Sequence, residues 1–595
     1  MKGINIIKFL VGLCLGCILL LLPLSQFQPD GLDSLRTLAV QLDGRKKPLD
    51  TVAKETIAKI HGSTAYRHTS GETVEREDYL TAYLGMWFNT RNWNEEPVVL
   101  VSYRPLKEAA NLDLERKQFT FQELMANRGL GAIVGQAHQK DAEGVDLSRD
   151  EREALTIEGR LNLLYQAVGD KSLPVVPHPS ESKGKWAGLG TAPQLYSPEA
   201  IAPVMAQFAL MQQALLAGLS DGGGSTHLPM VGPLADGLKA SLQQLSPEIY
   251  PADAVLAREV HFNHFHPFAK AWWLYGLAFI VMLVALWVKP WDLYWSAIGL
   301  FTAGIGVQSY GFFLRMQIAG RPPVTNMYES VVWVGFGIAA IALLFELTSR
   351  SRYYLLAAAP LAMVCLILAD SLPAVLDPSI SPLVPVLRDN FWLSIHVPTI
   401  ALSYASFALA LGLGHVALGN DLFAPTEKKR FKTLSQLNYR VLQVGVLLLT
   451  AGIILGGIWA HFSWGRFWGW DPKETWALIA LLCYLAPLHS RLTGWMGDFG
   501  INVASVVSFN AVLMAWYGVN FVLGTGLHSY GFGTGGSALV IAGVVGLDLL
   551  FVAIAAARHY NWFGVWLKGW PTGGLNSFRE SSSAANPAEG VAVGE

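Results

Sequence analysis

Residues 441–489 read VLQVGVLLLTAGIILGGIWAHFSWGRFWGWDPKETWALIALLCYLAPLH. The apolar run at each end of this stretch resembles a membrane-spanning helix, which needs about 20 mostly apolar residues. Between the two runs, residues 459–476 contain five of the 20 tryptophans of a 595-residue chain. The stretch therefore predicts two spanning helices that are joined at a membrane surface by a segment with a specialised role.

The composition of the whole chain agrees with a membrane protein. Hydrophobic residues make up 52% of the chain and charged residues 15%, whereas soluble proteins carry roughly 25% charged residues. The 43 Lys and Arg residues nearly balance the 45 Asp and Glu residues, so no basic excess indicates nucleic-acid binding. The four cysteines all lie in apolar runs, which argues against a disulfide framework or a cysteine-rich zinc site.

Ten apolar stretches are long enough to span a membrane. They are residues 6–24, 271–288, 294–313, 329–347, 353–369, 392–418, 441–460, 475–489, 500–523 and 537–557. The predicted fold is a polytopic α-helical membrane protein of about 10 transmembrane helices with one large periplasmic soluble domain. We expect an N-terminal anchor at 1–24, a soluble domain at 25–270, a transmembrane domain at 271–560 and a disordered tail at 561–595. An uncleaved anchor is favoured at 1–24 over a signal peptide because no small-x-small cleavage site follows convincingly.

The orientation follows from the distribution of Lys and Arg residues in the short loops. The strongest basic clusters are Arg350 with Arg352, and the five basic residues of loop 419–440. Ten spans place every such cluster on one side, which the positive-inside rule assigns to the cytoplasm together with the N-terminus. Residues 25–270 and 461–474 then lie outside. The soluble region shows helical patterns near 49–61, 151–168 and 199–218 and a β-like run at 97–103, with no catalytic spacing or repeat.

The tryptophan-rich loop, residues 462–476, has more structure than an aromatic belt at a membrane interface requires. Gly465 and Gly469 allow sharp turns that let flat rings line one surface. Asp471 is placed to cap the next helix, with Pro472 at its first position and Glu474 at its third. We therefore expect an aromatic shelf fixed to a helix start. An acid–base role for Asp471 and Glu474 is the alternative to capping, and capping is the commoner role.

Histidines cluster near the same membrane face. His396 lies near the outer end of the sixth span, His528 lies just beyond the ninth, and His461 lies beside the tryptophan segment. A lone intramembrane histidine is more often a packing residue, but two on one face beside a flat aromatic surface suit the axial ligation of a haem. His489 lies about 22 Å along its helix from Glu474 and belongs to the other face, where a second, deeper site is the functional alternative.

Several stretches resemble one protein family. The run WGRFWGWDPKETW at 464–476 resembles the WWD signature of haem-handling proteins, in the form found in the CcsA (ResC) branch of the System II cytochrome c biogenesis machinery. PVTNMYES at 323–330, SIHVP at 394–398, LHSR at 488–491 and LGTGLHS at 523–529 resemble further stretches of that family. The segment QLDGRKKPLDT at 41–51 is similar to a region that precedes the CcsA half in fusions of the two System II subunits.

The resemblance implies covalent attachment of haem to the Cys-x-x-Cys-His motif of apocytochrome c, as part of a holocytochrome c synthase, or haem lyase. Haem b is then the bound substrate, and the protein is located in the bacterial inner membrane as a multi-pass protein in contact with lipid. The implied iron ligands are His396, His528 and His489, and the catalytic groups stay unassigned. The implied haem-contacting residues are Trp464, Trp468, Trp470, Asp471, Glu474 and Trp476.

The resemblance also bears on partners. Fusions of the two subunits carry a CcsB (ResB) half with its own spans and membrane histidine, and neither is recognised in this sequence. A separate ResB/CcsB-like subunit is therefore the expected partner, together with apocytochrome c and haem. The main alternative function is a System I-type haem transporter or chaperone that does not complete the attachment; a glycan transferase and a scaffold are the others. Cys14-x-x-Cys17 is no haem-attachment motif, because Ile18 stands where histidine is needed.

Overall fold

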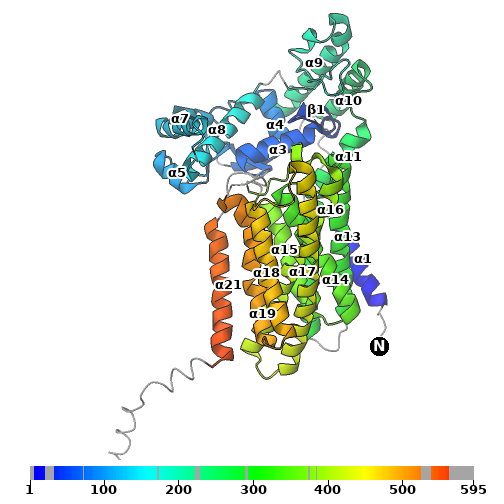
Figure 1. Cartoon of the computed structure of the whole chain (residues 1–595). Helices are drawn as coiled ribbons and strands as arrows, with labels where there is room; N and C mark the ends of the chain where they lie inside the picture. Colours follow the sequence, from blue (N-terminus) through cyan, green and yellow to red (C-terminus); the bar gives the residue numbers. More distant parts are fainter. Residues whose placement is uncertain are drawn as a thin grey trace, which may run out of the picture.

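The structure is a computed structural model that describes residues 6–20, 32–70, 73–145, 147–169, 173–220, 228–287, 293–372, 375–383, 385–523 and 538–561. It consists of a helical bundle and a smaller cap of helices and short strands at one end of that bundle (Figure 1). Almost all of the predicted tail at 561–595 lies outside the described residues.

The bundle contains α1 and the helices from α12 onward. Its elements are α1 (Ile6–Leu20), α12 (Pro267–Trp287), α13 (Tyr294–Ala319), α14 (Met327–Ser349), α15 (Tyr353–Ser371), η2 (Pro385–Arg388), α16 (Asn390–Phe423), α17 (Lys428–Trp464), α18 (Pro472–Leu492), α19 (Asp498–Val507), α20 (Phe509–Leu513), η3 (Met514–Leu523) and α21 (Ala538–His559). Successive spans run in opposite directions, and α19, α20 and η3 together form one span, Asp498–Leu523. The first turns of α14, α16 and α18 and the ends of α17 and η3 therefore lie at the cap end (Figure 1).

Within the described residues, ten helices are long and apolar enough to cross a membrane, and nine coincide with predicted spans. The tenth, α9 (Pro198–Ser220), lies in the cap against α10 (Figure 1). The predicted first span is described only as the 15-residue helix α1. This helix packs on α13, where a Cβ on Gly12 would come within 2.2 Å of the Ser296 carbonyl oxygen. The chain is thus a multi-span membrane protein.

Two predicted boundaries differ from the observed ones in α17. This helix begins at Lys428, well before the predicted span at 441, because residues 428–440 are rich in Lys, Arg and Leu, which favour helix in water as well as in lipid. It also continues to Trp464, so the irregular part of the tryptophan segment is 465–471, shorter than the predicted 462–476.

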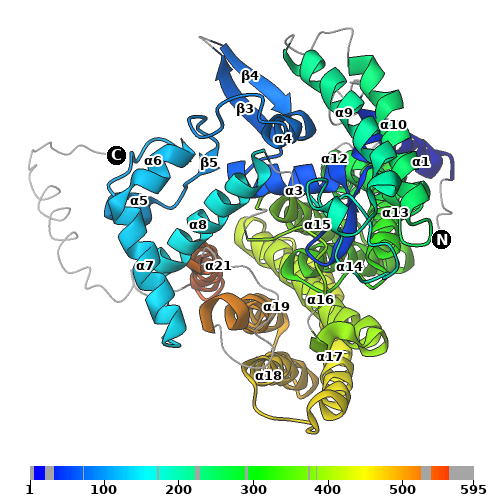
Figure 2. The same ribbon diagram turned by 90° about the horizontal axis from the view of Figure 1, so that it is seen from above.

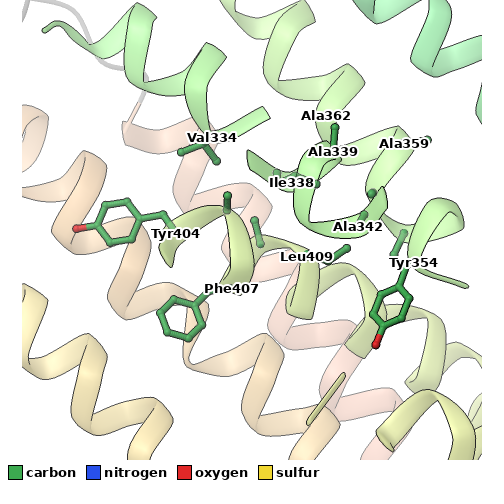
Figure 3. Close-up of a cluster of buried hydrophobic side chains, with 14 of the residues drawn as sticks. Val334, Ile338, Ala339, Ala342, Tyr354, Ala359, Ala362, Tyr404, Phe407 and Leu409 are labelled. Carbon is green, nitrogen blue, oxygen red and sulfur yellow. The ribbon is translucent and has the colours of Figure 1, made fainter. Parts of the chain in front are cut away.

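The bundle core is built from small residues between aromatic ones (Figure 3). Ala339, Ala342, Ala359 and Ala362 of α14 and α15 are all fully or nearly fully buried, which lets the backbones approach closely. Phe407 of α16 stacks on Tyr484 of α18 with ring centroids 3.8 Å apart, as part of the same core. The helices that surround the tryptophan segment are thereby held by close packing along their length.

The cap has a hydrophobic core of its own. Its elements are α2 (Asp33–Arg36), β1 (Ala39–Leu42), β2 (Arg45–Pro48), α3 (Leu49–His61), β3 (Ala65–Ser70), β4 (Thr73–Asp78), α4 (Tyr79–Trp87), β5 (Val99–Leu100), α5 (Arg104–Ala109), β6 (Gln118–Phe119), α6 (Phe121–Ala126), α7 (Arg128–Ala142), α8 (Arg149–Ala167), η1 (Ala192–Gln194), α9, α10 (Leu228–Leu245) and α11 (Asp253–Phe265). The strands form three antiparallel pairs: β1 with β2, β3 with β4, and β5 with β6. The three predicted helices correspond to α3, α8 and α9, whereas the predicted β-run at 97–103 yields only the two-residue β5.

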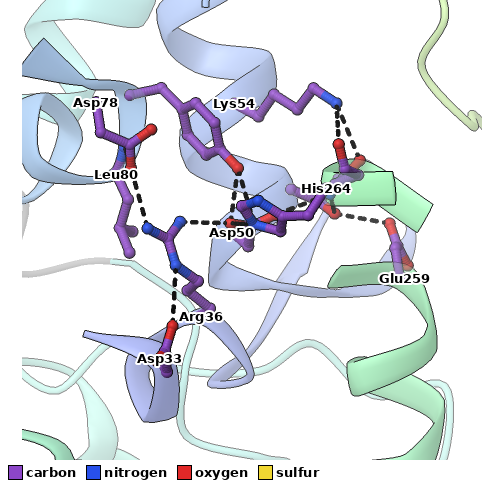
Figure 4. Close-up of polar contacts among 11 residues, drawn as sticks. Asp33, Arg36, Asp50, Lys54, Asp78, Leu80, Glu259 and His264 are labelled. Carbon is purple, nitrogen blue, oxygen red and sulfur yellow. Dashed lines mark hydrogen bonds and ion pairs between the residues drawn. The ribbon is translucent and has the colours of Figure 1, made fainter. Parts of the chain in front are cut away.

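A buried polar network joins the cap to the helix that leads into the bundle (Figure 4). The Asp50 carboxylate of α3 is fully buried and accepts hydrogen bonds from Arg36 Nη1 at 2.8 Å and from Asn263 Nδ2 of α11 at 3.0 Å. His264 Nε2 lies 3.0 Å from the same carboxylate. Arg45 forms a bidentate pair with Glu259 of α11 at 2.6 and 2.7 Å. Because α11 is followed directly by α12, this network sets how the cap sits on the bundle.

Candidate functional site

A cavity of about 200 Å³ lies at the cap end of the bundle. It is enclosed by the starts of α14, α16 and α18, the ends of α17 and η3, and the tryptophan segment. Its walls include Thr325, Asn326, His396, Tyr404, Trp459, Trp464, Trp468, Lys473, Glu474, Trp516 and Asn520. Seen from above, the ends of α17 and α18 lie at an edge of the bundle that the labelled cap helices do not overlie (Figure 2). Residues 524–537, which contain His528, lie outside the described part of the chain.

His396 is held in a defined orientation in the cavity wall. Its Nδ1 lies 2.9 Å from the backbone carbonyl oxygen of Gly452 in α17. A carbonyl only accepts hydrogen bonds, so Nδ1 carries the hydrogen, and in a neutral ring Nε2 then has the lone pair. The ring also meets Trp459 edge-on, with centroids 5.7 Å apart. Metal-bound histidines commonly donate their second nitrogen to a backbone carbonyl in the same way.

The start of α18 forms the predicted capping box. Asp471 is buried, and one of its oxygens accepts from the Lys473 backbone N–H at 3.0 Å. Glu474 accepts in return from the backbone N–H groups of Asp471, at 3.2 Å, and of Gly469, at 2.8 Å. Glu474 also pairs with Arg466 at 3.4 Å. Both carboxylates are therefore used in holding the tryptophan segment to the helix start.

The tryptophan rings do not form one flat shelf. Trp464 and Trp468 line the cavity, as does Trp459. Trp470 is 70% exposed, and its ring stands at 89° to that of Trp468. Its φ of 58° is left-handed, a conformation that costs a non-glycine residue roughly 1–2 kcal/mol. Trp476 faces a different, apolar recess between α18 and the α19–α20 segment.

The segment that begins α14 also lines the cavity, and a buried ion pair between Arg315 and Glu329 fixes its position. Glu329 receives hydrogen bonds from Arg315 Nε and from the Thr325 hydroxyl, each at 2.7 Å, and both charged side chains are almost fully buried. Asn326 caps the helix by accepting from the Glu329 backbone N–H at 2.8 Å. The Ser330 hydroxyl accepts from Trp516 Nε1 at 3.0 Å, which links this wall to η3.

Three other histidines that the structure describes in the bundle lie apart from the cavity. His489 is exposed near the end of α18 that faces away from the cap, with Nδ1 2.8 Å from the Leu485 carbonyl. His415 pairs with Asp548 of α21 at 2.7 Å and is thereby engaged in packing. His461 is exposed at the end of α17 and is not among the cavity residues. His489 and Glu474 thus lie near opposite ends of α18, as predicted.

Sequence reasoning did not single out Tyr404, Trp516 or Lys473, which all line the cavity. Tyr404 and Trp516 lie in long apolar spans, where an aromatic residue gives no signal of its own. Lys473 is a cation within the tryptophan segment of the sequence. Its position in the first turn of α18 could have indicated a role in the site.

The described residues contain no group of three or more His, Cys, Asp or Glu side chains that could hold a metal ion. A single oriented imidazole among indole rings instead suits a metal whose planar macrocycle supplies four ligands of its own. The cavity thus combines one oriented imidazole with three indole rings, at one end of a multi-span membrane protein.

Comparisons with known proteins define the family. The family profile described as "Cytochrome C assembly protein" matches residues 324–528. Cytochrome c biogenesis protein CcsA of Synechococcus sp. (strain CC9902) is 35% identical over 291 residues, which cover 43% of this chain and 94% of that protein. The chain belongs to the CcsA-type cytochrome c assembly family.

Two other proteins are similar to parts of the chain. Protein NrfI of Wolinella succinogenes is 30% identical over 506 residues, 82% of this chain, and the chain spans only about half of that relative, 53%. A solved structure titled "Cytochrome c Heme Lyase CcmF" aligns with 51% of each chain at 15% identity and a TM-score of 0.36, a likeness too remote to carry an argument.

Proposed function

We propose that the cavity at the cap end holds haem for covalent attachment to apocytochrome c. The observation that carries the proposal is that His396, oriented by the Gly452 carbonyl, lines the same cavity as Trp459, Trp464 and Trp468. Indole rings contribute large apolar contact to a flat ring, and an oriented imidazole contributes an axial ligand. Haem b is the substrate in this proposal, and His528 supplies the second axial ligand from the segment that follows η3.

The attachment needs positioning more than it needs an acid or a base from the protein. Each thioether forms when a cysteine S–H adds across a haem vinyl group, with the sulfur bonding to one carbon and the hydrogen to the other. Holding two thiols of a Cys-x-x-Cys-His peptide near two vinyl groups supplies much of the rate enhancement. Asp471 and Glu474 are engaged in the capping box, so we assign them to positioning.

The proposal requires that the cavity face the periplasm. The basic residues at 350–352 and 428–432 lie at the end of the bundle away from the cap (Figure 1). The positive-inside rule then supports a cytoplasmic location for that end in the bacterial inner membrane, with the cap and the cavity outside. Apocytochrome c would reach the cavity from the periplasm. His489, at the basic end, would serve a second, inner haem site together with a ResB/CcsB-like subunit.

The test is cytochrome maturation in a host without its own system, with a ResB-like subunit co-expressed. His396→Gly should abolish maturation and lower the haem retained by the purified protein, and added imidazole should partly restore both. His415→Gly is the matched control, since His415 lies in the same helix and pairs with Asp548. Normal haem retention by the folded His396→Gly protein would contradict the proposal. Normal retention of haem by the wild type without any thioether formation would favour haem delivery of the System I type.

A further inference from the structure

Three residues of α16 pack into three glycines of α17. A Cβ added to Gly456 would lie 2.6 Å from Cε1 of His396. A Cβ on Gly452 would lie 2.5 Å from Ile400 Cδ1, and one on Gly445 would lie 2.5 Å from Phe407 Cε1. The spacing of four and then seven residues is the same on both helices, as antiparallel packing requires. Close contact through small residues is the usual way for membrane helices to approach.

The contact at Gly456 differs from the other two because its partner is the imidazole of His396, a side chain that can bind a metal ion. The added Cβ would also lie 3.1 Å from Nδ1 and 3.3 Å from Nε2 of His396, so the imidazole meets the glycine with its Cε1 atom and the two nitrogens bonded to it. One turn earlier, the Gly452 carbonyl oxygen is 2.9 Å from Nδ1. Trp459 closes the edge of the ring with a perpendicular contact. The imidazole is thus confined at Cε1, at one nitrogen and along one edge.

We infer that Gly456 is a positioning residue for the axial ligand: its missing side chain and the Gly452 carbonyl together direct His396 Nε2 toward the haem iron. This inference rests on the proposed function, because it assumes that His396 binds haem. A methyl group at position 456 would have to displace the ring, since a separation of 2.6 Å is below what carbon atoms tolerate. The displaced ring would lose its hydrogen bond to Gly452 and its alignment with the iron.

The experiment compares Gly456→Ala with Gly445→Ala in the full chain, purified with haem bound. Both substitutions add one methyl group against an aromatic ring in the same helix pair, so both should lower the melting temperature. Only Gly456→Ala should change the haem: we expect about 10-fold weaker haem retention, the scale seen when groups that orient a metal ligand are lost. Its iron should lose the low-spin absorption spectrum, and added imidazole should restore that spectrum. Gly445→Ala should keep the wild-type spectrum.

A double variant shows whether the effect passes through His396. In a His396→Ala background the methyl group at 456 meets no ring, so Gly456→Ala should cause no further loss of haem. A full additional loss there, an unchanged spectrum in Gly456→Ala, or equal losses in Gly456→Ala and Gly445→Ala would overturn the inference. If Gly456→Ala fails to accumulate, recovery of accumulation in the double variant supports the contact, and continued failure contradicts it. Unchanged haem binding in His396→Ala alone would instead contradict the proposed function.

Discussion

At the scale of single residues, the acidic groups of the tryptophan segment and the helix start that follows it bind the backbone. Asp471 and Glu474 each accept backbone N–H bonds at the start of α18, and Glu474 bridges the amides on either side of Trp470. That bridge holds Trp470 in its left-handed conformation, which a tryptophan rarely adopts. The segment is therefore a shaped turn in which aromatic residues take fixed directions.

Substitution of Asp471 separates capping from acid–base catalysis. Asp471→Ala should lower the free energy of unfolding by about 1 kcal/mol, because a helix N-cap is lost, and should reduce haem retention. Asp471→Ser keeps an N-cap oxygen but no ionisable group, so it should retain most of the haem and most of the maturation activity. Thermal denaturation measures the stability of the two variants, and a maturation assay measures their activity. Equal loss of maturation in both, with Asp471→Ser normally stable, would assign Asp471 to proton transfer.

The two neighbouring tryptophans should differ in their effect on haem. Trp468 lines the cavity, whereas Trp470 is 70% exposed. Trp468→Ala should therefore lower the haem retained per purified protein more than Trp470→Ala does. Trp470→Gly should leave stability unchanged or slightly raised, because glycine adopts a positive φ without strain. A larger loss of haem from Trp470→Ala than from Trp468→Ala would indicate that haem lies on the outer side of the segment.

These residues also show what local sequence can predict. The capping box was predictable because its hydrogen bonds join residues two and three apart, a spacing that the sequence shows directly. The ring directions were not, since they depend on the φ of Trp470 and, for Trp459, on contact with His396 of α16, which is distant in sequence. The same holds for Gly456, which in the sequence is one of several glycines in an apolar run.

At the scale of elements, the bundle and the cap are connected through α3 and α11. Burial by itself would raise the pKa of the Asp50 carboxyl, but the hydrogen bond and charge of His264 and then those of Arg36 outweigh it and lower that pKa to about 2. The ordinary value is 3.8, so the folded state favours the ionised form. The 41–51 segment that resembles the family's fusions contributes Arg45 and Asp50 to this junction, which gives it a structural role.

The stability of the junction should depend on pH through Asp50. Because the pKa is lower in the folded state, ionised Asp50 contributes about 2 kcal/mol above pH 3.8, and this contribution is lost as the pH falls toward 2. Hydrogen exchange of α3 and α11 in the full chain should show less protection in Asp50→Asn than in wild type at pH 7. The difference should decrease as the pH falls below 3.8. A difference that stays constant down to pH 2.5 would mean that the ionised carboxylate is not what stabilises the junction.

At the scale of the whole molecule, hydropathy predicted the spans well because burial in lipid demands a continuous apolar length. The helix α9 was predicted at 199–218 within the soluble region and lies in the cap, although it is as long and apolar as a spanning helix. Hydropathy could not predict that β2 packs on α11 through pairs such as Arg45 with Glu259, which are 214 residues apart. The structure places the cap and the cavity at one end of the bundle, and the basic residues at 350–352 and 428–432 at the other (Figure 1).

This arrangement makes a topological prediction that all of the proposed chemistry requires. Single cysteines introduced at Glu143 in the cap and at Trp470 beside the cavity should react with a membrane-impermeant maleimide in cells with a permeabilised outer membrane. A cysteine at Lys429, in the first turn of α17 at the opposite end, should react only after the inner membrane is disrupted. All three positions are exposed, so access to the side chain does not distinguish them. The four native cysteines are replaced by alanine beforehand. Labelling of Lys429→Cys alone in such cells would place the cavity in the cytoplasm, where the apocytochrome thiols could not meet it after export.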